Sequence, residues 1–204
     1  MGAPPEERIY AVADPGVIVS ADAGCPWAVG GGAMAGLVAI DQFRDPVDPQ
    51  HVLGMGALPG RNELDVFESR DAGISYSGPL FTAPAGATLT GMEIAASDNT
   101  ILYVTFYQTP GTGPRLARSN NGGHDWTVFD LQQDLGEVIP YLAAVDPEDP
   151  NVVYLRLSGG TATTRYEALG VTHDGGATFS APVTIPEGAL TSFLRRSDGT
   201  VLVA

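Results

Sequence analysis

The octapeptide SADAGCPW, which runs from Ser20 to Trp27, returns three more times in this chain of 204 residues. The later copies are SRDAGISY at 69–76, SNNGGHDW at 119–126 and THDGGATF at 172–179. They share the form Ser/Thr-x-Asp/Asn-x-Gly-x-x-aromatic, and their starts are 49, 50 and 53 residues apart. One copy would be weak evidence, but four copies at near-constant spacing predict a repeat architecture that runs through the whole chain.

The segments around the octapeptides repeat as well. DPVDPQHVL at 45–53 matches DPEDPNVVY at 146–154, and SDNTILYV at 97–104 matches SDGTVLVA at 197–204. In each of them a turn signal leads into an apolar run rich in β-branched residues, which is typical of a strand. The 26 glycines and 16 prolines divide the chain into short runs, and short runs favour strands over long helices.

Each repeat is predicted to hold four strands, named A to D in chain order. In the third repeat we expect them near 88–96, 101–107, 115–119 and 126–131. Runs such as TILYVTFY and VVYLRL are apolar on both faces, which indicates a sheet that is covered on both sides. Covered four-stranded sheets that recur along the chain predict blades stacked around an axis.

The octapeptide resembles the Asp-box, or bacterial neuraminidase repeat, of sialidase-like, sortilin-like and xyloglucanase-like β-propellers and of photosystem II assembly factors. The resemblance covers nearly the whole chain. Asn121 replaces the aspartate in the third copy, and Tyr76 and Phe179 replace the tryptophan in the second and fourth. The resemblance implies an all-β fold: a β-propeller of four-stranded antiparallel blades with Asp-box hairpins, here a partial propeller of about four blades.

Each octapeptide is interpreted as the hairpin between strands C and D. The Ser or Thr ends strand C, and the Asp or Asn side chain accepts backbone N–H groups of its own turn. The glycine supplies a positive φ, and the aromatic residue opens strand D and buries apolar surface. The residues expected to hold this structural role are Ser20, Asp22, Gly24, Trp27, Ser69, Asp71, Gly73, Tyr76, Ser119, Asn121, Gly123, Trp126, Thr172, Asp174, Gly176 and Phe179.

The whole chain, 1–204, is interpreted as a single propeller domain or a fragment of one. The expected blades span approximately 8–33, 35–83, 88–131 and 139–185, and a further blade starts at 190–204. The first blade has strands B, C and D, and the last has only A and B, so the two ends do not complete one blade cleanly. We therefore expect a piece of a larger propeller, with self-association through its exposed blade edges as the alternative.

Strand direction sorts the loops onto two edges of each blade. The octapeptide hairpins and the A–B turns share one edge, and the B–C and D–A loops share the other, where the resemblance places ligand sites. Polar residues of these second loops are the candidate binding residues, although ordinary solvated loop residues remain the alternative. They are Arg61, Asn62, Gln108, Arg115, Asp134, Glu137 and Arg165, with Glu187 beside them.

Charge and composition exclude several kinds of partner. The net charge is −14, and nucleic-acid binding needs a basic stripe, so no nucleic acid is expected. No apolar run is long enough to span a bilayer, so membrane insertion is not expected either. Cys25 is the single cysteine, and His51, His124 and His173 lie far apart, so neither a metal site nor a cofactor is predicted.

The function predicted from these observations is a non-catalytic Asp-box propeller that serves as a binding or scaffold surface for a carbohydrate or protein ligand. The start MGAPPEERIY does not have the pattern of a signal peptide. Because the chain reads as a fragment and many proteins of this resemblance are exported, we expect an extracellular or periplasmic full-length protein.

The alternative is a truncated extracellular glycosidase of the sialidase or xyloglucanase type. The Arg-Ile-Pro hallmark of sialidases is missing, since Arg8 and Ile9 are followed by Tyr10. Most glycosidases need two acids that face each other, whereas Asp134 and Glu137 lie on one loop. No catalytic residue is therefore predicted. A third interpretation, an assembly factor, would need an arginine-rich patch that the acidic charge disfavours.

Overall fold

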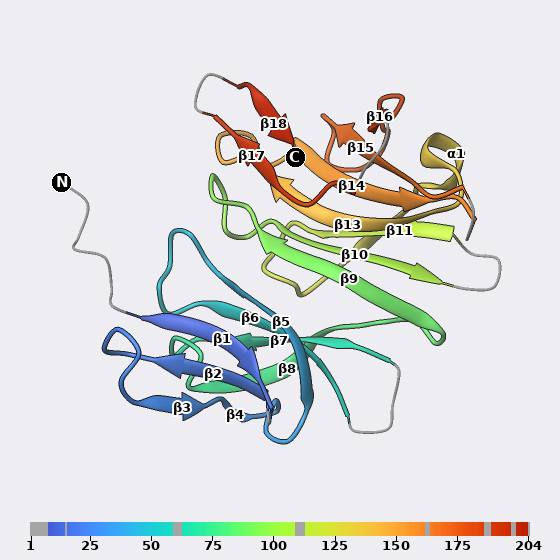
Figure 1. Ribbon diagram of the computed structural model, residues 1–204. Helices are drawn as coiled ribbons and strands as arrows, with labels where there is room; N and C mark the ends of the chain where they lie inside the picture. Colours follow the sequence, from blue (N-terminus) through green and yellow to red (C-terminus); the bar gives the residue numbers. More distant parts are fainter. Residues whose placement is uncertain are drawn as a thin grey trace. The chain divides into compact units, whose positions relative to one another are not determined.

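The computed structural model describes residues 8–14, 16–58, 63–108, 113–161, 164–185, 189–196 and 199–203 (Figure 1). Nearly all regular structure in these ranges is β, and the strands form antiparallel blades of the β-propeller type. The predicted all-β, β-propeller fold with four blades is confirmed. The chain divides into two compact units, Met1–Ala85 and Gly86–Ala204, which are described one at a time.

The first unit holds two blades. The first blade is a sheet of β1 (Ile9–Ala13), β2 (Gly16–Ser20) and β3 (Trp27–Val29), in that order. The second blade contains β5 (Val38–Arg44), β6 (Val52–Ala57), β7 (Asp65–Ser69) and β8 (Ser75–Thr82), and β4 (Gly31–Gly32) adds to its outer edge. The strand order is therefore β4-β8-β7-β6-β5, with β4 parallel to β8 and the remaining pairs antiparallel.

The sequence did not predict β4, which consists of two glycines. The backbone N–H of Gly31 donates to the carbonyl of Ile74 at 2.8 Å, and that of Ala33 donates to the carbonyl of Tyr76 at 2.7 Å. Gly32 has a φ of 69°, and a Cβ at this position would collide with the backbone of Tyr76. A glycine is therefore required where the chain crosses from one blade to the next.

The second unit holds two four-stranded blades and the start of another. The third blade consists of β9 (Ala87–Ile94), β10 (Leu102–Gln108), β11 (Gly113–Ser119) and β12 (Thr127–Asp130). The fourth consists of β13 (Val138–Val145), β14 (Val153–Gly159), β15 (Tyr166–Thr172) and β16 (Val183–Ile185). A hairpin of β17 (Phe193–Arg195) and β18 (Val201–Val203) follows. The strands predicted for the third repeat agree within two residues, the ordinary uncertainty of strand ends.

The core of each unit lies between its blades, which explains the continuous apolar runs of the sequence. All six residues of β6 and the first five of β10 are buried, as expected for strands whose two faces are both covered. In the first unit a buried cluster joins Val17, Met34, Val52, Phe67 and Tyr76. In the second, a larger cluster joins residues of the third and fourth blades, among them Tyr103, Leu116, Leu135, Leu155 and Leu157.

The loop between the third and fourth blades contains α1 (Gln132–Leu135), a single helical turn. Its backbone hydrogen bonds are made within the turn: the N–H groups of Leu135 and Gly136 donate to the carbonyls of Leu131 and Gln132, both at 2.9 Å. Leu135 is the buried residue of this turn. Across the described ranges, no helix has the length and apolar character needed to cross a membrane.

Candidate functional site

The four octapeptides form hairpins with the same hydrogen bonds. In each, the side-chain oxygen of the first residue accepts the backbone N–H of the glycine four residues later, at 2.8, 2.8, 2.8 and 3.1 Å in chain order. The same hydroxyl donates to the Asp or Asn two residues later, at 2.9, 2.8, 3.0 and 2.7 Å. These hydroxyl residues are fully buried, and they are Ser20, Ser69, Ser119 and Thr172.

The Asp or Asn oxygen then closes the turn from the other side. In the later copies it accepts the backbone N–H four residues on, from Ser75, Asp125 and Thr178, at 2.8–2.9 Å. In the first copy that position is Pro26, which has no N–H, and Asp22 accepts the N–H of Cys25 at 2.9 Å instead. In the fourth copy, hydrogen bonds from Thr178 lower the pKa of Asp174 to about 2. These side chains are therefore engaged within their own turns.

The aromatic residues of the four copies differ in their surroundings. Tyr76 is buried in the core of the first unit, and Phe179 packs against the core of the second. Trp126 donates its indole N–H to the carbonyl of Gly123 at 2.9 Å. Trp27 is 43% exposed, because it opens the outermost strand of a blade with only three described strands.

The loop residues predicted to bind a ligand are not equally placed. Arg61, Asn62 and Glu187 lie outside the described residues. Gln108 ends β10, where it pairs with Gly113. Two others are held by the protein itself. Arg115 forms an ion pair with Asp130 at 2.8 Å, and a carboxylate oxygen of Asp134 accepts the backbone N–H of Phe179 at 2.9 Å. Glu137 and Arg165 are exposed to solvent.

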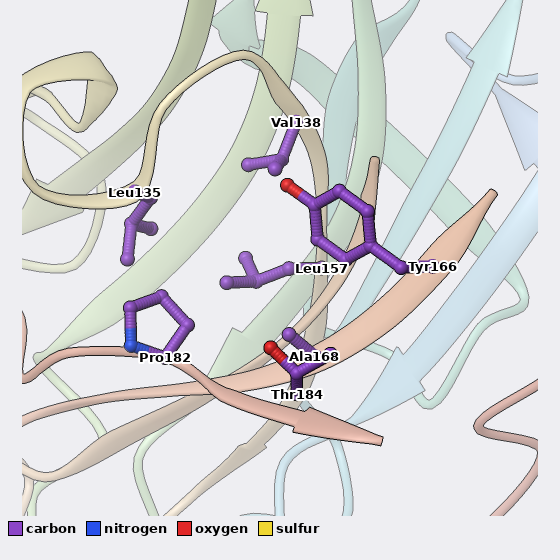
Figure 2. A pocket seen from close by; sticks show the side chains of 7 residues that line it. All are labelled: Leu135, Val138, Leu157, Tyr166, Ala168, Pro182 and Thr184. Atoms are coloured by element: carbon purple, nitrogen blue, oxygen red, sulfur yellow. The ribbon is translucent and has the colours of Figure 1, made fainter. Parts of the chain in front are cut away.

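An apolar hollow of about 410 Å³ lies in the fourth blade, on the edge that carries the D–A and B–C loops (Figure 2). It is lined by Leu135, Val138, Leu157, Tyr166, Ala168, Pro182 and Thr184. Figure 2 shows Leu157 between Tyr166 on one side and Pro182 on the other. Among these lining side chains, only the hydroxyls of Tyr166 and Thr184 are polar.

The register of the sheet builds the floor of the hollow. Leu157 lies opposite Ala168, and Ala168 lies opposite Thr184, so the three side chains form one row across β14, β15 and β16. Directly opposite residues of neighbouring antiparallel strands share a face of the sheet. The small Ala168 at the centre of the row leaves the space, and Leu135 of α1 and Val138 at the start of β13 close one wall.

A glycine fixes the wall that Tyr166 forms. Tyr166 is paired with Gly159 across β14 and β15, and its ring lies over this residue. A Cβ at Gly159 would be 2.5 Å from Cζ of Tyr166 and 2.6 Å from its hydroxyl oxygen. Because real atoms do not approach this closely, the ring can occupy its position only over a glycine.

Three of the predicted residues adjoin lining residues of this hollow in the chain, although none of the three lines it. Asp134 and Glu137 flank Leu135 and Val138 on the loop of α1, and Arg165 precedes Tyr166. The apolar lining itself was missed, because sequence reasoning searched the loops for polar groups. The buried leucine of QQDLGEV was the signal within this loop that could have indicated it.

A second hollow, of about 580 Å³, lies in the first unit between the end of β1 and the start of β5. Its lining includes Val12, Asp14, Gly36 and Val38. Val12 and Val38 are 42% and 54% exposed, so these two apolar side chains of the lining are in contact with solvent.

A chain of ionisable side chains lies on the opposite edge of the second blade, and two of its members, Asp45 and His51, are buried. Nδ1 of His51 is 2.9 Å from Oδ2 of Asp45, and its Nε2 is 3.1 Å from Oε1 of Glu68. Glu68 is also paired with Arg70 at 2.6 Å. The neighbouring His51 ring is the main cause that lowers the pKa of Glu68. Sequence analysis left His51 without a role, because the three residues are separated in the chain.

Comparison with known proteins identifies the class but no family. No protein-family model matches the chain, and no curated protein matches its sequence. Solved structures do match. A GH74 xyloglucanase from Xanthomonas campestris has 18% identity and a TM-score of 0.61, over 99% of this chain and 32% of its own. A GH74 enzyme from Niastella koreensis has 17% identity and a TM-score of 0.63, over 98% and 31%.

YCF48 from Cyanidioschyzon merolae also matches, with 23% identity and a TM-score of 0.52, over 82% of this chain and 49% of its own. The matched proteins are β-propellers, and the chain is a β-propeller protein by fold. It spans about a third of the length of the two GH74 proteins. At these identities the likeness concerns the fold alone.

Proposed function

We propose that the chain is a segment of an Asp-box β-propeller that acts as a non-catalytic binding surface, and that the hollow of the fourth blade contacts the ligand. The apolar hollow at the loop edge carries this proposal. Binding pockets are typically concave and mostly apolar, with a few polar groups that set orientation, and they measure roughly 300–1,000 Å³. The hollow, with its volume of about 410 Å³ and its two hydroxyls, fits this description.

The contacts of two of the predicted binding residues support binding over catalysis. Asp134 accepts a backbone hydrogen bond from Phe179, and Arg115 is paired with Asp130. A residue that is held in this way positions the loop. Glycoside hydrolysis by paired carboxylates needs two acids on opposite sides of the scissile bond, whereas Asp134 and Glu137 share one short loop.

Binding without turnover is the outcome that tests the proposal. The purified chain would be titrated with xyloglucan oligosaccharides and with synthetic peptides, and the methyl resonances of Leu135, Val138 and Leu157 would be followed by NMR. We expect at least one probe class to shift these resonances. A probe that binds only elsewhere on the chain would contradict the proposed site.

The second candidate is a truncated glycosidase, which the shared fold with GH74 proteins motivates. It predicts release of reducing sugar from xyloglucan or turnover of fluorogenic glycosides by the chain. Turnover that is abolished by Glu137→Gln would overturn the non-catalytic proposal. Turnover that survives this variant in a purified, homogeneous sample would overturn it as well, with the acid located elsewhere.

A further inference from the structure

We propose that the hollow of the fourth blade receives one large apolar side chain of an extended, positively charged peptide segment of a partner protein, which adds to the outer edge of β16. This inference rests on the proposed binding function and specifies its ligand. It joins three independent features of the second unit: a terminal strand, a row of side chains that ends on that strand, and an acidic loop beside the hollow.

The terminal strand supplies the backbone contacts. In the described part of the fourth blade the strand order is β13-β14-β15-β16, so β16 has a strand neighbour on one side only. It pairs with β15 through Val183, Thr184 and Ile185. The outer side of such a strand carries backbone N–H and C=O groups that an extended peptide can pair with, which is a recurrent mode of peptide recognition.

The side-chain row directs the peptide's side chain toward the hollow. Leu157, Ala168 and Thr184 lie opposite one another on successive strands, and all three line the hollow. A strand added beside β16 would extend this row by one side chain, next to Thr184. Because side chains alternate between the faces of a strand, every second residue of the peptide would point to this face.

The lining selects an apolar side chain rather than a sugar. Leu135, Val138, Leu157, Ala168 and Pro182 offer hydrocarbon surface, and two hydroxyls are the polar groups of the lining. A sugar ring placed here would leave most of its hydroxyls without partners, which is unfavourable in an apolar site. A leucine or aromatic side chain would instead bury apolar surface in the hollow, which is favourable.

The charges around the hollow favour a cationic peptide. Asp134 and Glu137 are exposed on the loop that carries Leu135 and Val138, and the described basic residues in the chain positions that adjoin the lining are Arg156 and Arg165. Glu167 is paired with Arg156 at 2.8 Å. The net charge of −14 extends the same preference over long distances, since it attracts cations and repels anions.

The test uses the full chain with methyl-labelled leucine and valine. The probes are a short synthetic peptide that alternates lysine with valine around a central leucine, the same peptide with serine at its centre, and the same peptide with glutamate in place of lysine. A xyloglucan oligosaccharide is the fourth probe. Thr184→Trp fills the hollow from its rim, and Val183→Trp is the matched control, because Val183 is 62% exposed and does not line the hollow.

We expect the lysine–leucine peptide to shift the resonances of Leu157 and Val138. The serine and glutamate peptides should bind at least about tenfold more weakly, which corresponds to about 1.4 kcal/mol. Thr184→Trp should abolish the shifts, and Val183→Trp should retain them. Glu137→Gln should weaken binding of the lysine peptide, whereas Glu137→Asp should not.

Four results would overturn the inference. Equal binding of the lysine and glutamate peptides would contradict the preference for a cationic peptide. Equal binding of the lysine–leucine peptide to Thr184→Trp and Val183→Trp would contradict the hollow as the binding site. Shifts of Leu157 and Val138 by the oligosaccharide alone would refute the peptide ligand while leaving the proposed binding function intact. If none of the four probes shifts these resonances, both the inference and the proposed function fail.

Discussion

Nδ1 of His51 lies 2.9 Å from Oδ2 of Asp45, and both side chains are almost completely buried in the A–B turn of the second blade. The other carboxylate oxygen of Asp45 accepts the N–H groups of Val47 and Asp48 at 2.7 and 3.0 Å. The corresponding turn of the third blade has the same backbone bond, from Ala95 to Ile101 at 3.0 Å, but apolar side chains. The fold therefore accommodates both a polar and an apolar version of one turn.

Replacing His51 alone should be costly. His51→Ile leaves the carboxylate of Asp45 buried without the imidazole, and breaking a buried pair in this way costs about 3–5 kcal/mol. The double variant Asp45→Ala/His51→Ile reproduces the apolar pair of the third blade and should lose less than the single variant. Urea unfolding of the three proteins measures these differences. A double variant that is less stable than His51→Ile would contradict the equivalence of the two turns.

The half-buried Glu93 should make stability depend on pH. Burial raises its pKa to about 7, although one oxygen accepts the N–H of Val145 at 3.0 Å. A carboxyl group whose folded pKa is raised contributes its full stability below its unfolded pKa, and this contribution is lost as pH rises through the folded value. Relative to Glu93→Gln, the natural protein should therefore lose on the order of 2 kcal/mol between pH 5 and pH 8.

Unfolding midpoints of both proteins at pH 5 and pH 8 measure this effect. The difference in unfolding midpoint between the two proteins should be small at pH 5. At this pH the folded proteins carry an uncharged carboxylic acid and an uncharged amide at position 93. An identical pH dependence of the two proteins would show that Glu93 stays ionised in the fold.

The hydroxyl of each octapeptide should contribute measurably to stability. Ser119→Ala leaves the buried N–H of Gly123 without its acceptor at 2.8 Å, and an unsatisfied buried donor costs about 1–3 kcal/mol. Ser119→Thr should be tolerated, because the fourth copy has Thr172 at this position with the same bonds. The exposed Ser77 serves as a control, and Ser77→Ala should change the unfolding free energy by less than about 0.5 kcal/mol.

Gly159→Ala should displace the ring of Tyr166 and so alter the hollow. The new methyl group would lie 2.5 Å from the ring, and the ring must move because the strand backbone is held in the sheet. Methyl resonances of Leu157 should shift in this variant in the absence of ligand. Adding Tyr166→Ser removes the clash, so the double variant should regain stability relative to Gly159→Ala. No gain would mean that the strand itself had adjusted.

The repeat made most of the fold predictable from sequence. Strands near 101–107 and 115–119 follow from alternating turn signals and apolar runs, because a covered strand must be apolar on both faces. The pair β4 and β8 could not be anticipated, since β4 has two residues and its hydrogen bonds go to a strand more than 40 residues away. The one-turn helix α1 is too short to leave a periodic pattern.

The candidate site was less accessible to sequence reasoning. Asp134 reads as an exposed loop acid, but its hydrogen bond to Phe179 spans 45 residues of sequence. The hollow depends on the small size of Ala168 and on Gly159 beneath Tyr166, and neither residue type signals a binding site by itself. Polar residues in loops thus indicated the edge of the fourth blade on which the hollow lies, whereas the hollow itself is lined by residues of four strands, by a helical turn and by Pro182.

The short strand β4 has a consequence for how the first unit opens. Gly31 and Ala33 follow the last strand of the first blade, yet their amide protons are bound to carbonyls of the second blade. Exchange of these protons with solvent requires separation from β8, and that separation also frees the connection to β3. The amides of the linker should therefore exchange together with those of β8, as one cooperative subglobal event rather than as local fraying.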